Sequence, residues 1–450
     1  MVKDMTKGAV TPILLKFSLP LLVSVIFQQL YNISDSIIAG RFINNDALSA
    51  IGASYPITMI FLAIGMGMNV GCSVVISTLF GAKDYKQMKT AVFTSLISTG
   101  VLAVVLTVVG YFTSGIFLRL LGTDETIFSD SQTYLNIYVF GLLFLFIYNI
   151  CTGIFTALGD GNTPLYFLIG SSLGNIAMDL LFVAVFKMGV AGTAWATFIC
   201  QGICSILAFF VLIRRIGKIK SERFKYFDCA MLGKIAVLSI PSILQQSFVS
   251  VGNLFIQSLV NSCGKEVVAG YASAIKLNTF VVTCFSTVGN SVSSFTAQNV
   301  GAGEYPRVRK GFKVGALLSV GIAVLFSALY IIFSNGLIYL FMDQTKENTA
   351  AAAEAGRHFL TVVSPFYFAV SVKLVCDGVL RGGRRMTAFM VTTFSDLILR
   401  VIFAFIFKPT FGATGIWLSW PVGWVISGVM SAVLYLWYIR SLKRLPVKSD

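Results

Sequence analysis

Charged residues are scarce in this sequence. Only 12% of its 450 residues are Asp, Glu, Lys or Arg, and it holds a single histidine, His358. A soluble domain of this size needs much more polar surface, so a soluble fold is excluded. Hydrophobic residues make up 56% of the chain, and the mean hydropathy is +0.83. The composition therefore predicts a polytopic membrane protein.

Other absences narrow the function. There is no Walker A sequence and no soluble segment that would house an ATPase, so transport would use an ion gradient or a partner protein. The lone His358 excludes a histidine relay. The eight cysteines are scattered singly; Cys200 and Cys204 lie one helical turn apart without a second pair, so we expect no metal site. We also expect no cleavable signal peptide, because the first apolar stretch is too long.

Apolar segments of about 20 residues or more recur along the chain, separated by short polar loops. They predict an all-α fold of twelve transmembrane helices. The expected spans are 13–39, 48–77, 90–116, 131–157, 163–187, 190–214, 231–260, 267–297, 312–341, 355–380, 386–407 and 413–439. An even number of spans places both termini on one side.

The basic residues indicate which side that is. The termini and the loops on their side hold 24 of the 34 Lys and Arg, and the alternate loops hold seven. Lys276, Lys373 and Arg400 fall inside spans. Because cytoplasmic loops carry the excess of basic residues, we expect both termini in the cytoplasm. Topology then accounts for the net charge of +15, and no nucleic-acid partner is expected.

Three pairs of short motifs reveal an internal repeat. "GAKDY" at Gly81 matches "GAGEY" at Gly301, Pro20 matches Pro241, and "GVAGTAWA" at Gly189 matches "GATGIWLS" at Gly412, all at offsets of 220 to 223 residues. The sequence thus predicts two parallel six-helix lobes: an N-lobe over residues 1–213, a basic linker over 214–228 and a C-lobe over 229–450. Parallel repeats are typical of transporters that rock two lobes about a central site.

Few polar residues lie deep in the first-half spans. Asp35, Asn175, Asp179 and Thr197 all fall within roughly 6–18 Å of the outer surface, at about 1.5 Å of rise per residue. Asn175 and Asp179 are four residues apart and share a helix face. Carboxylate, amide and hydroxyl oxygens at one level suit Na⁺, and the carboxylates can instead hold a proton. Alternatively, the two acids extend to the interface and Asn175 bonds neighbouring helices.

The second half differs at the matching positions. Asp396 and Arg400 align with Asn175 and Asp179, and their spacing of one turn favours a structural ion pair. No acidic residue occupies the position in the second half that corresponds to Asp35. Lys276 either reaches the interface or lines the cavity. Pro20 in the first span predicts a kink that would serve as a hinge beside the site.

These residues together resemble the MATE family of multidrug and toxic compound extrusion transporters, along nearly the whole chain. The likeness rests on Pro20 and Asp35 in "SLPLLVSVIFQQLYNISDSIIAGRF", "GNIAMDLL", "GTAWAT" and "GVLRGGRRMT". It implies two six-helix bundles around a central cleft and an N-lobe site for H⁺ or Na⁺. That site would comprise Asp35, Asn175, Asp179 and Thr197, with Tyr31 and Tyr134 as polar neighbours. NorM-like members carry one acid in helix 7 and another in helix 10; the corresponding windows here, "LQQSFVS" and "YFAVSVKL", contain no acid, which favours the DinF-like or MepA-like branch.

The expected function is therefore secondary active antiport. The protein would export organic, cationic and amphipathic drugs or toxins in exchange for H⁺ or Na⁺, by alternating access, and would not be an enzyme. We expect a monomer in the cell inner (plasma) membrane, with the bilayer and an organic substrate as partners and no cofactor beyond the coupling ion. The alternative is a lipid-linked oligosaccharide flippase of the same superfamily, although such cargo calls for more Arg or Lys in the spans than this chain has.

Overall fold

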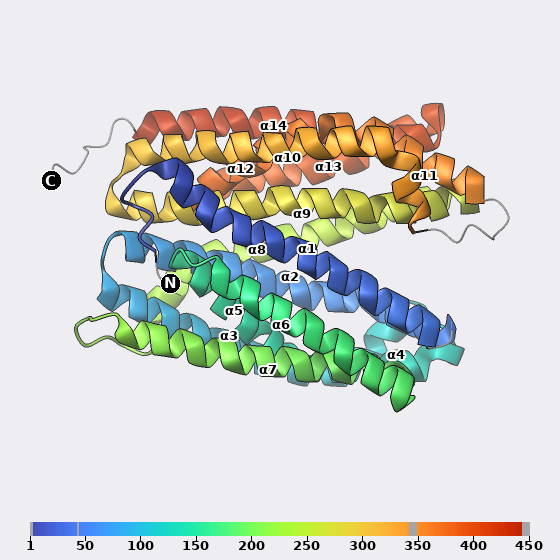
Figure 1. The fold of residues 1–450 in the computed structure, drawn as a ribbon, viewed down its shortest axis with the longest axis horizontal. Helices are drawn as coiled ribbons and strands as arrows, with labels where there is room; N and C mark the ends of the chain where they lie inside the picture. Colours follow the sequence, from blue (N-terminus) through green and yellow to red (C-terminus); the bar gives the residue numbers. More distant parts are fainter. Residues whose placement is uncertain (1–2, 43–44, 342–348, 443–450) are drawn as a thin grey trace. The chain divides into compact units, whose positions relative to one another are not determined.

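The structure is a computed structural model, and it describes residues 3–42, 45–341 and 349–442; the side chains of residues 32–48 lie outside the description. The described chain is helical throughout, without strands (Figure 1). Its first half contains α1 (Val10–Phe42), α2 (Asn45–Gly81), α3 (Tyr85–Leu120), α4 (Glu125–Phe140), α5 (Leu142–Ala157), α6 (Asn162–Asp179), the π-helix η1 (Leu180–Val185) and α7 (Gly189–Lys218). The second half contains α8 (Cys229–Asn261), α9 (Lys265–Ala302), α10 (Tyr305–Tyr339), α11 (Thr349–Val363), the 3₁₀ turn η2 (Ser364–Phe366), α12 (Tyr367–Gly382), α13 (Met386–Phe411) and α14 (Ala413–Leu442).

The predicted all-α polytopic fold is confirmed. In the described ranges, eleven helices or helix combinations are long and apolar enough to cross a membrane, and the bent pair α4 and α5 makes a twelfth. That pair bends by 46° at Gly141, a residue without a side chain to oppose the bend. The span Thr349–Gly382 is interrupted by η2, where Pro365 supplies no backbone N–H and breaks the ladder of helical hydrogen bonds. Most observed helices extend beyond the predicted spans, because polar residues at their ends continue the helix beyond the apolar core. The spans predicted over 163–187 and 312–341 instead end at Val185 and Tyr339.

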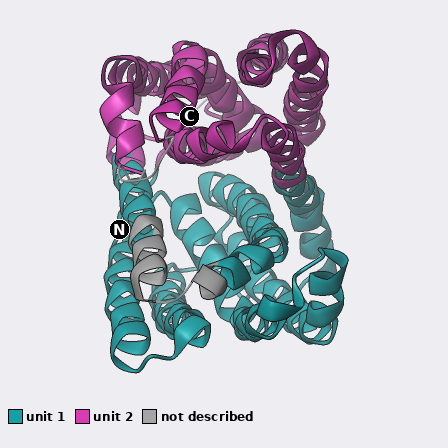
Figure 2. Ribbon diagram, turned by 90° about the vertical axis from the view of Figure 1, so that its right-hand side faces the viewer, with its two compact units in different colours: residues 1–4, 19–247 teal, residues 5–18, 248–450 magenta. Residues whose placement is uncertain are grey.

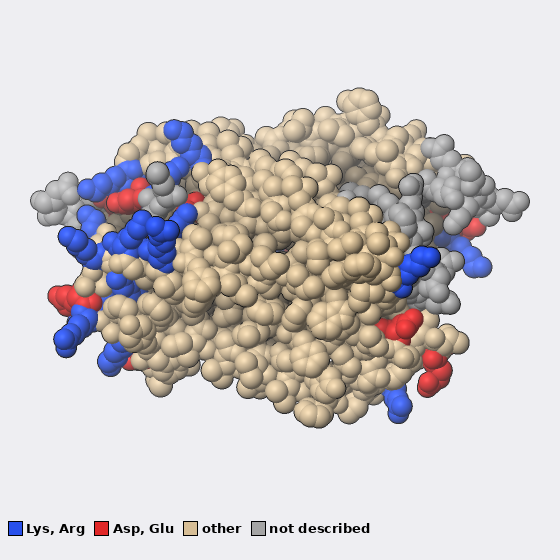
Figure 3. Space-filling view, turned by 60° about the horizontal axis from the view of Figure 1, so that its bottom comes forward, with Lys and Arg blue, Asp and Glu red and all other residues tan. Residues whose placement is uncertain are grey.

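The outer surface explains why these helices need a bilayer. Large apolar side chains are widely exposed, among them Phe112, Leu317 and Ile332, each at least 70% exposed. Figure 3 shows a broad region of one face without charged side chains; most of the Lys and Arg in this view lie on one side of it, and a few lie on the other. An exposed apolar surface of this extent is stable against hydrocarbon and unstable in water.

Contacts divide the chain into two compact units (Figure 2). Unit 1 comprises residues 1–4 and 19–247, and unit 2 comprises residues 5–18 and 248–450. The divisions fall inside α1 and inside α8, so each of these helices contributes to both units. The predicted lobes, 1–213 and 229–450, instead divide the chain at its repeat and remain a prediction about topology.

Each unit has its own apolar core. In unit 1, Phe61, Leu135 and Phe146 are buried among α2, α3, α4 and α5. In unit 2 the core is strongly aromatic, with Tyr271 stacked on Trp417 at a ring-centroid distance of 5.2 Å. These cores hold the helices that carry the polar residues described next.

Candidate functional site

A buried polar cluster joins α6 to α7 in unit 1. Asn175 is 4% exposed, and Asp179, one turn further along α6, is fully buried. Thr197 faces them from α7 and is half-buried. Three of the four residues predicted for the cation site are thus brought together by two consecutive helices.

The amide of Asn175 is the centre of this cluster. In one orientation its Nδ2 donates to Thr197 Oγ1 at 3.3 Å. In the reversed orientation Nδ2 donates to Asp179 Oδ2 at 2.6 Å, while Oδ1 accepts from the Thr197 backbone N at 3.2 Å. The reversed orientation matches each donor to an acceptor, so it is the one that burial favours. Asn175 then holds the Asp179 carboxylate by a hydrogen bond from a neutral group.

The helix changes type immediately after Asp179. The π-helix η1 begins at Leu180, and its wider turn is closed by the bond from Phe186 N to Leu181 O at 2.9 Å. π-Helical turns are rare, occur mostly as single turns within α-helices and are frequent at functional sites. Asp179 therefore lies at a junction between two helical geometries.

The remaining predicted members of the site surround it less completely. Asp35 belongs to α1, but its side chain lies outside the described residues, so its place in the pocket stays a prediction. Tyr31 lies on α1 and is half-buried. Tyr134 on α4 is half-buried and packs against a small cluster with Ala50 and Val190. Pro20 lies inside α1, two residues beyond the point where that helix passes between the units.

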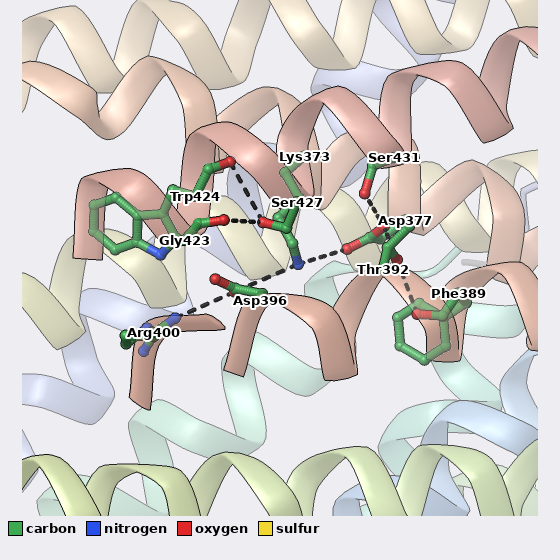
Figure 4. Close-up of polar contacts among 10 residues, drawn as sticks. All are labelled: Lys373, Asp377, Phe389, Thr392, Asp396, Arg400, Gly423, Trp424, Ser427 and Ser431. Carbon is green, nitrogen blue, oxygen red and sulfur yellow. Dashed lines mark hydrogen bonds and ion pairs between the residues drawn. The ribbon is translucent and has the colours of Figure 1, made fainter. Parts of the chain in front are cut away.

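Four charged side chains form a buried quartet in unit 2: Lys373, Asp377, Asp396 and Arg400. They lie on α12 and α13, beneath α14, and each is at most 7% exposed (Figure 4). Lys373 Nζ lies 3.0 Å from Asp377 Oδ2 and 3.7 Å from Asp396 Oδ2. Arg400 Nη2 lies 3.2 Å from Asp396 Oδ2. Two cations and two anions leave the quartet with no net formal charge, which is the condition for burying ions at moderate cost.

The two carboxylates of the quartet are held unequally. Asp377 Oδ1 accepts hydrogen bonds from Thr392 at 2.9 Å and Ser431 at 2.8 Å, so both its oxygens are used. Asp396 Oδ1 and Arg400 Nε are buried and have no hydrogen-bond partner within the described ranges. The guanidinium of Arg400 instead lies over the Trp420 ring, 4.2 Å from its centroid. Asp396 thus depends on Oδ2 alone for its neutralisation.

Reasoning from the sequence found half of this quartet. It predicted contact between Asp396 and Arg400, and the structure places them in an ion pair. It left Lys373 without a role and did not select Asp377. The signal was available: Lys373 and Asp377 stand four residues apart in an apolar helix, the spacing of a helical ion pair. Lys276, whose role was left open, places its Nζ 5.7 Å from the ring centroid of Phe341.

A third charged contact lies outside the spans, in the loop between α5 and α6. Asp160 accepts hydrogen bonds from the Thr163 hydroxyl at 2.7 Å and from the backbone N of Asn162, and it pairs with Arg215 on α7. Burial acts to raise the pKa of Asp160, but the bonds from Thr163 and Arg215 outweigh it and hold the pKa below its ordinary value. Asp160 therefore holds the first backbone N–H groups of α6 and joins the start of that helix to α7.

Within the described chain, no three His, Cys, Asp or Glu side chains are grouped as metal ligands. The polar clusters offer amide, hydroxyl and carboxylate oxygens, which suit H⁺ or Na⁺ better than a transition metal. The chemistry available to the unit 1 cluster is thus reversible loading of a buried carboxylate.

Known proteins provide an independent comparison. The MatE family model matches residues 20–181 and 241–406. The chain is 30% identical over 440 residues to "Probable multidrug resistance protein YpnP" of Bacillus subtilis, covering 97% of each chain. It is 24% identical over 441 residues to "Multidrug export protein MepA" of Staphylococcus haemolyticus, covering 96% of this chain and 93% of MepA.

A solved structure agrees on the fold. The outward-facing conformation of a multidrug resistance MATE family transporter aligns with a TM-score of 0.92 at 22% identity, covering 98% of both chains. The family model alone spans more than half of the sequence in two similar segments, one in each half. The chain therefore belongs to the MatE family of membrane transporters, which are not enzymes.

Proposed function

We propose that this protein exports organic drugs or toxins, cationic and amphipathic in character, in exchange for H⁺ or Na⁺. The names of its relatives, a multidrug resistance protein and a multidrug export protein, support the substrate class. The coupling cation binds at Asn175, Asp179 and Thr197, together with Asp35 from α1. Tyr31 and Tyr134 are neighbouring polar groups, and no other cofactor takes part.

The observation that carries this proposal is the fully buried carboxylate of Asp179, held by the amide of Asn175. A buried carboxylate is costly when it is charged and much less so when it is protonated or ligated. Loading and unloading a cation therefore changes the free energy of this region by a large amount. That difference is what allows an ion gradient to drive a conformational change, since a ligand biases two states only through its differential affinity for them.

The first helix is the element that we propose to respond. The division between the units falls between Ser18 and Leu19 of α1, and Pro20 is the second residue beyond it. Proline removes a backbone hydrogen bond, so bending there costs less than elsewhere in the helix. Loading of the site would let α1 repack on unit 1, and unloading would reverse this. Both termini lie in the cytoplasm in this proposal, and the monomer is the working unit in the plasma membrane.

Replacement of the acids by amides tests the proposal. We expect Asp179→Asn and Asp35→Asn to fold, because the size of each side chain is kept, and to lose gradient-driven export at least about tenfold. The measurement is dye efflux from vesicles under an imposed pH gradient or an imposed Na⁺ gradient, one at a time. The gradient that drives the wild type identifies the coupling ion.

Asp130→Asn is the matched control, because Asp130 is an exposed acid on α4 and should tolerate the change. Rates are normalised to the amount of protein in the membrane. Wild-type efflux in Asp179→Asn would overturn the assignment of the coupling site.

A further inference from the structure

The quartet in unit 2 occupies the positions that the internal repeat relates to the unit 1 cluster. An offset of 221 residues carries Asn175 to Asp396 and Asp179 to Arg400. The offset of 223 that relates "GVAGTAWA" to "GATGIWLS" carries Thr197 to Trp420. The contacts join the corresponding helix pair but not equivalent residues: Asn175 on α6 reaches Thr197 on α7, whereas Arg400 on α13, the counterpart of Asp179, reaches Trp420 on α14. The same helix pair is thus used in both halves.

These positions form two triplets: Asn175, Asp179 and Thr197 in unit 1, and Asp396, Arg400 and Trp420 in unit 2. The two triplets have opposite chemistry. In unit 1 the three positions supply an amide, a carboxylate and a hydroxyl, all with oxygens. In unit 2 the only oxygens come from Asp396, and Arg400 brings a permanent positive charge within 3.2 Å of them. Trp420 covers the other side of the guanidinium, where a hydroxyl would stand in unit 1. A cation is therefore built into the unit 2 triplet as a side chain.

We infer that Arg400 is a tethered cation that closes a second ion-coupling site in unit 2. This rests on the proposed function of the unit 1 cluster and adds to it the reason why one half of the transporter responds to a gradient. A guanidinium stays protonated at every physiological pH and cannot leave its site. Asp396 is thereby permanently neutralised, as the carboxylate in unit 1 is when a cation is bound. It therefore does not load and release an ion during transport.

The surroundings of Asp396 show why the charge on Arg400 decides this. Lys373 on α12 lies closer to Asp377, at 3.0 Å, than to Asp396, at 3.7 Å. Thr392 on α13 and Ser431 on α14 donate to Asp377 and contribute no charge. Arg400 thus makes the shorter of the two ionic contacts of Asp396. Without it the remaining three charges sum to −1 in a buried place.

A buried net charge is unstable and is neutralised by whatever cation can enter. Removal of the charge at Arg400 should therefore open a site for one monovalent cation, a proton or Na⁺, at Asp396. Gly423 on α14 lets the backbone approach Asp396 closely, since a Cβ added there would lie only 3.2 Å from Asp396 Oδ1. The acceptor for the new cation is that oxygen, which has no hydrogen-bond partner among the described residues.

The test measures cation binding to purified full-length protein in nanodiscs, by ²²Na⁺ equilibrium binding and by proton uptake in weakly buffered solution. Arg400→Met should bind about one cation per chain more than the wild type, because the variant must neutralise one buried charge. The gain should vanish in Arg400→Met/Asp396→Asn and in Arg400→Lys, which restores the tethered charge. Arg357→Met, at an exposed arginine paired with Glu354 on α11, should leave binding unchanged.

The gain should survive in Arg400→Met/Asp179→Asn, which separates it from the unit 1 site. If Asp179→Asn alone binds as many ions as the wild type, the proposed function fails at that residue while the Arg400 result still stands. Arg400→Gln keeps a donor for Asp396 without the charge, and it replaces Arg400→Met if the latter does not fold. Folded Arg400→Gln or Arg400→Met with wild-type binding of both ions would overturn the inference.

Discussion

Units 1 and 2 bury carboxylates on related helices in opposite ways. In unit 1, Asp179 is fully buried and takes a hydrogen bond from the neutral amide of Asn175. In unit 2, Asp377 and Asp396 each face a cation, and the four charges of the quartet sum to zero. The comparison teaches that burial of an acid does not by itself mark a coupling site. In unit 2 the neutralising charges are side chains of the protein, whereas in unit 1 we propose that a bound H⁺ or Na⁺ supplies the neutralising charge.

The largest effect that would test this comparison comes from breaking the quartet. Asp396→Leu alone strands Arg400 and should cost about 3–5 kcal/mol of stability, whereas Asp396→Leu/Arg400→Met removes both charges and should cost much less. Folded yield and export are measured for the two variants in parallel. Equal losses in the single and double variants, at normal expression, would mean that Asp396 and Arg400 do not act as a structural ion pair.

The corresponding change in unit 1 should separate stability from function. Asn175→Leu removes the donor to Asp179 and leaves a buried carboxylate oxygen unsatisfied, which costs about 1–3 kcal/mol. Because a charged Asp179 becomes harder to bury, export should shift toward the conditions in which Asp179 is loaded. The readout is the pH and Na⁺ dependence of dye efflux.

Thr126→Val, at an exposed hydroxyl on α4, is the control for Asn175→Leu. A decrease in export that is the same at every pH and every Na⁺ concentration would argue against a role for Asn175 at the cation site.

Two glycines of α14 offer a test of the space around Asp396. A Cβ at Gly423 would lie 3.2 Å from Asp396 Oδ1 and 3.3 Å from its backbone O, tighter than ordinary contact. At Gly428 the closest atom would be at 3.4 Å. Gly423→Ala should therefore lower stability by about 1 kcal/mol more than Gly428→Ala, as mild overpacking does. Thermal unfolding in detergent measures the stability of both variants. Equal melting temperatures would show that α13 shifts to accommodate the added methyl group.

The smallest expected effect concerns Asp160. Its pKa is lowered in the folded protein, so its contribution to stability is complete above the ordinary pKa of about 3.9 and is lost as pH falls through the lowered value. Asp160→Asn cannot titrate. The stability difference between wild type and Asp160→Asn should thus shrink as pH falls below about 4. Unfolding midpoints at pH 3 to 6 measure it, and a constant difference would contradict the assigned ion pair.

The fold was predictable because the same sequence pattern, an apolar run followed by a short polar loop, recurs along the chain. Apolar runs, short loops and the bias of Lys and Arg specify the spans without any tertiary information. The bend at Gly141 and the π-helix after Asp179 were not predictable, because both depend on how neighbouring helices pack rather than on local propensity. Asn175 and Asp179 could be selected by depth, since few polar residues occur at that level.

The quartet marks the limit of such reasoning. Asp396 and Arg400 were found because their spacing closes an ion pair within one helix. The spacing of Lys373 and Asp377 offered the same signal, but the contacts of Asp377 with Thr392 and Ser431 lie between helices, and no spacing in the sequence relates them. The cation–π contact of Arg400 with Trp420 likewise joins two helices, so no spacing within one helix predicts it.

The length of the helices has a consequence for the surrounding lipid. α9 has 38 residues, which at 1.5 Å per residue makes it about 57 Å long, against a hydrocarbon thickness of about 30 Å. Such a helix must tilt or project well into the headgroup layers at both ends. A thinner or thicker bilayer then shifts which residues are immersed without exposing the helix ends to hydrocarbon. The transporter should accordingly tolerate membranes of different thickness better than a protein whose helices only just span the hydrocarbon.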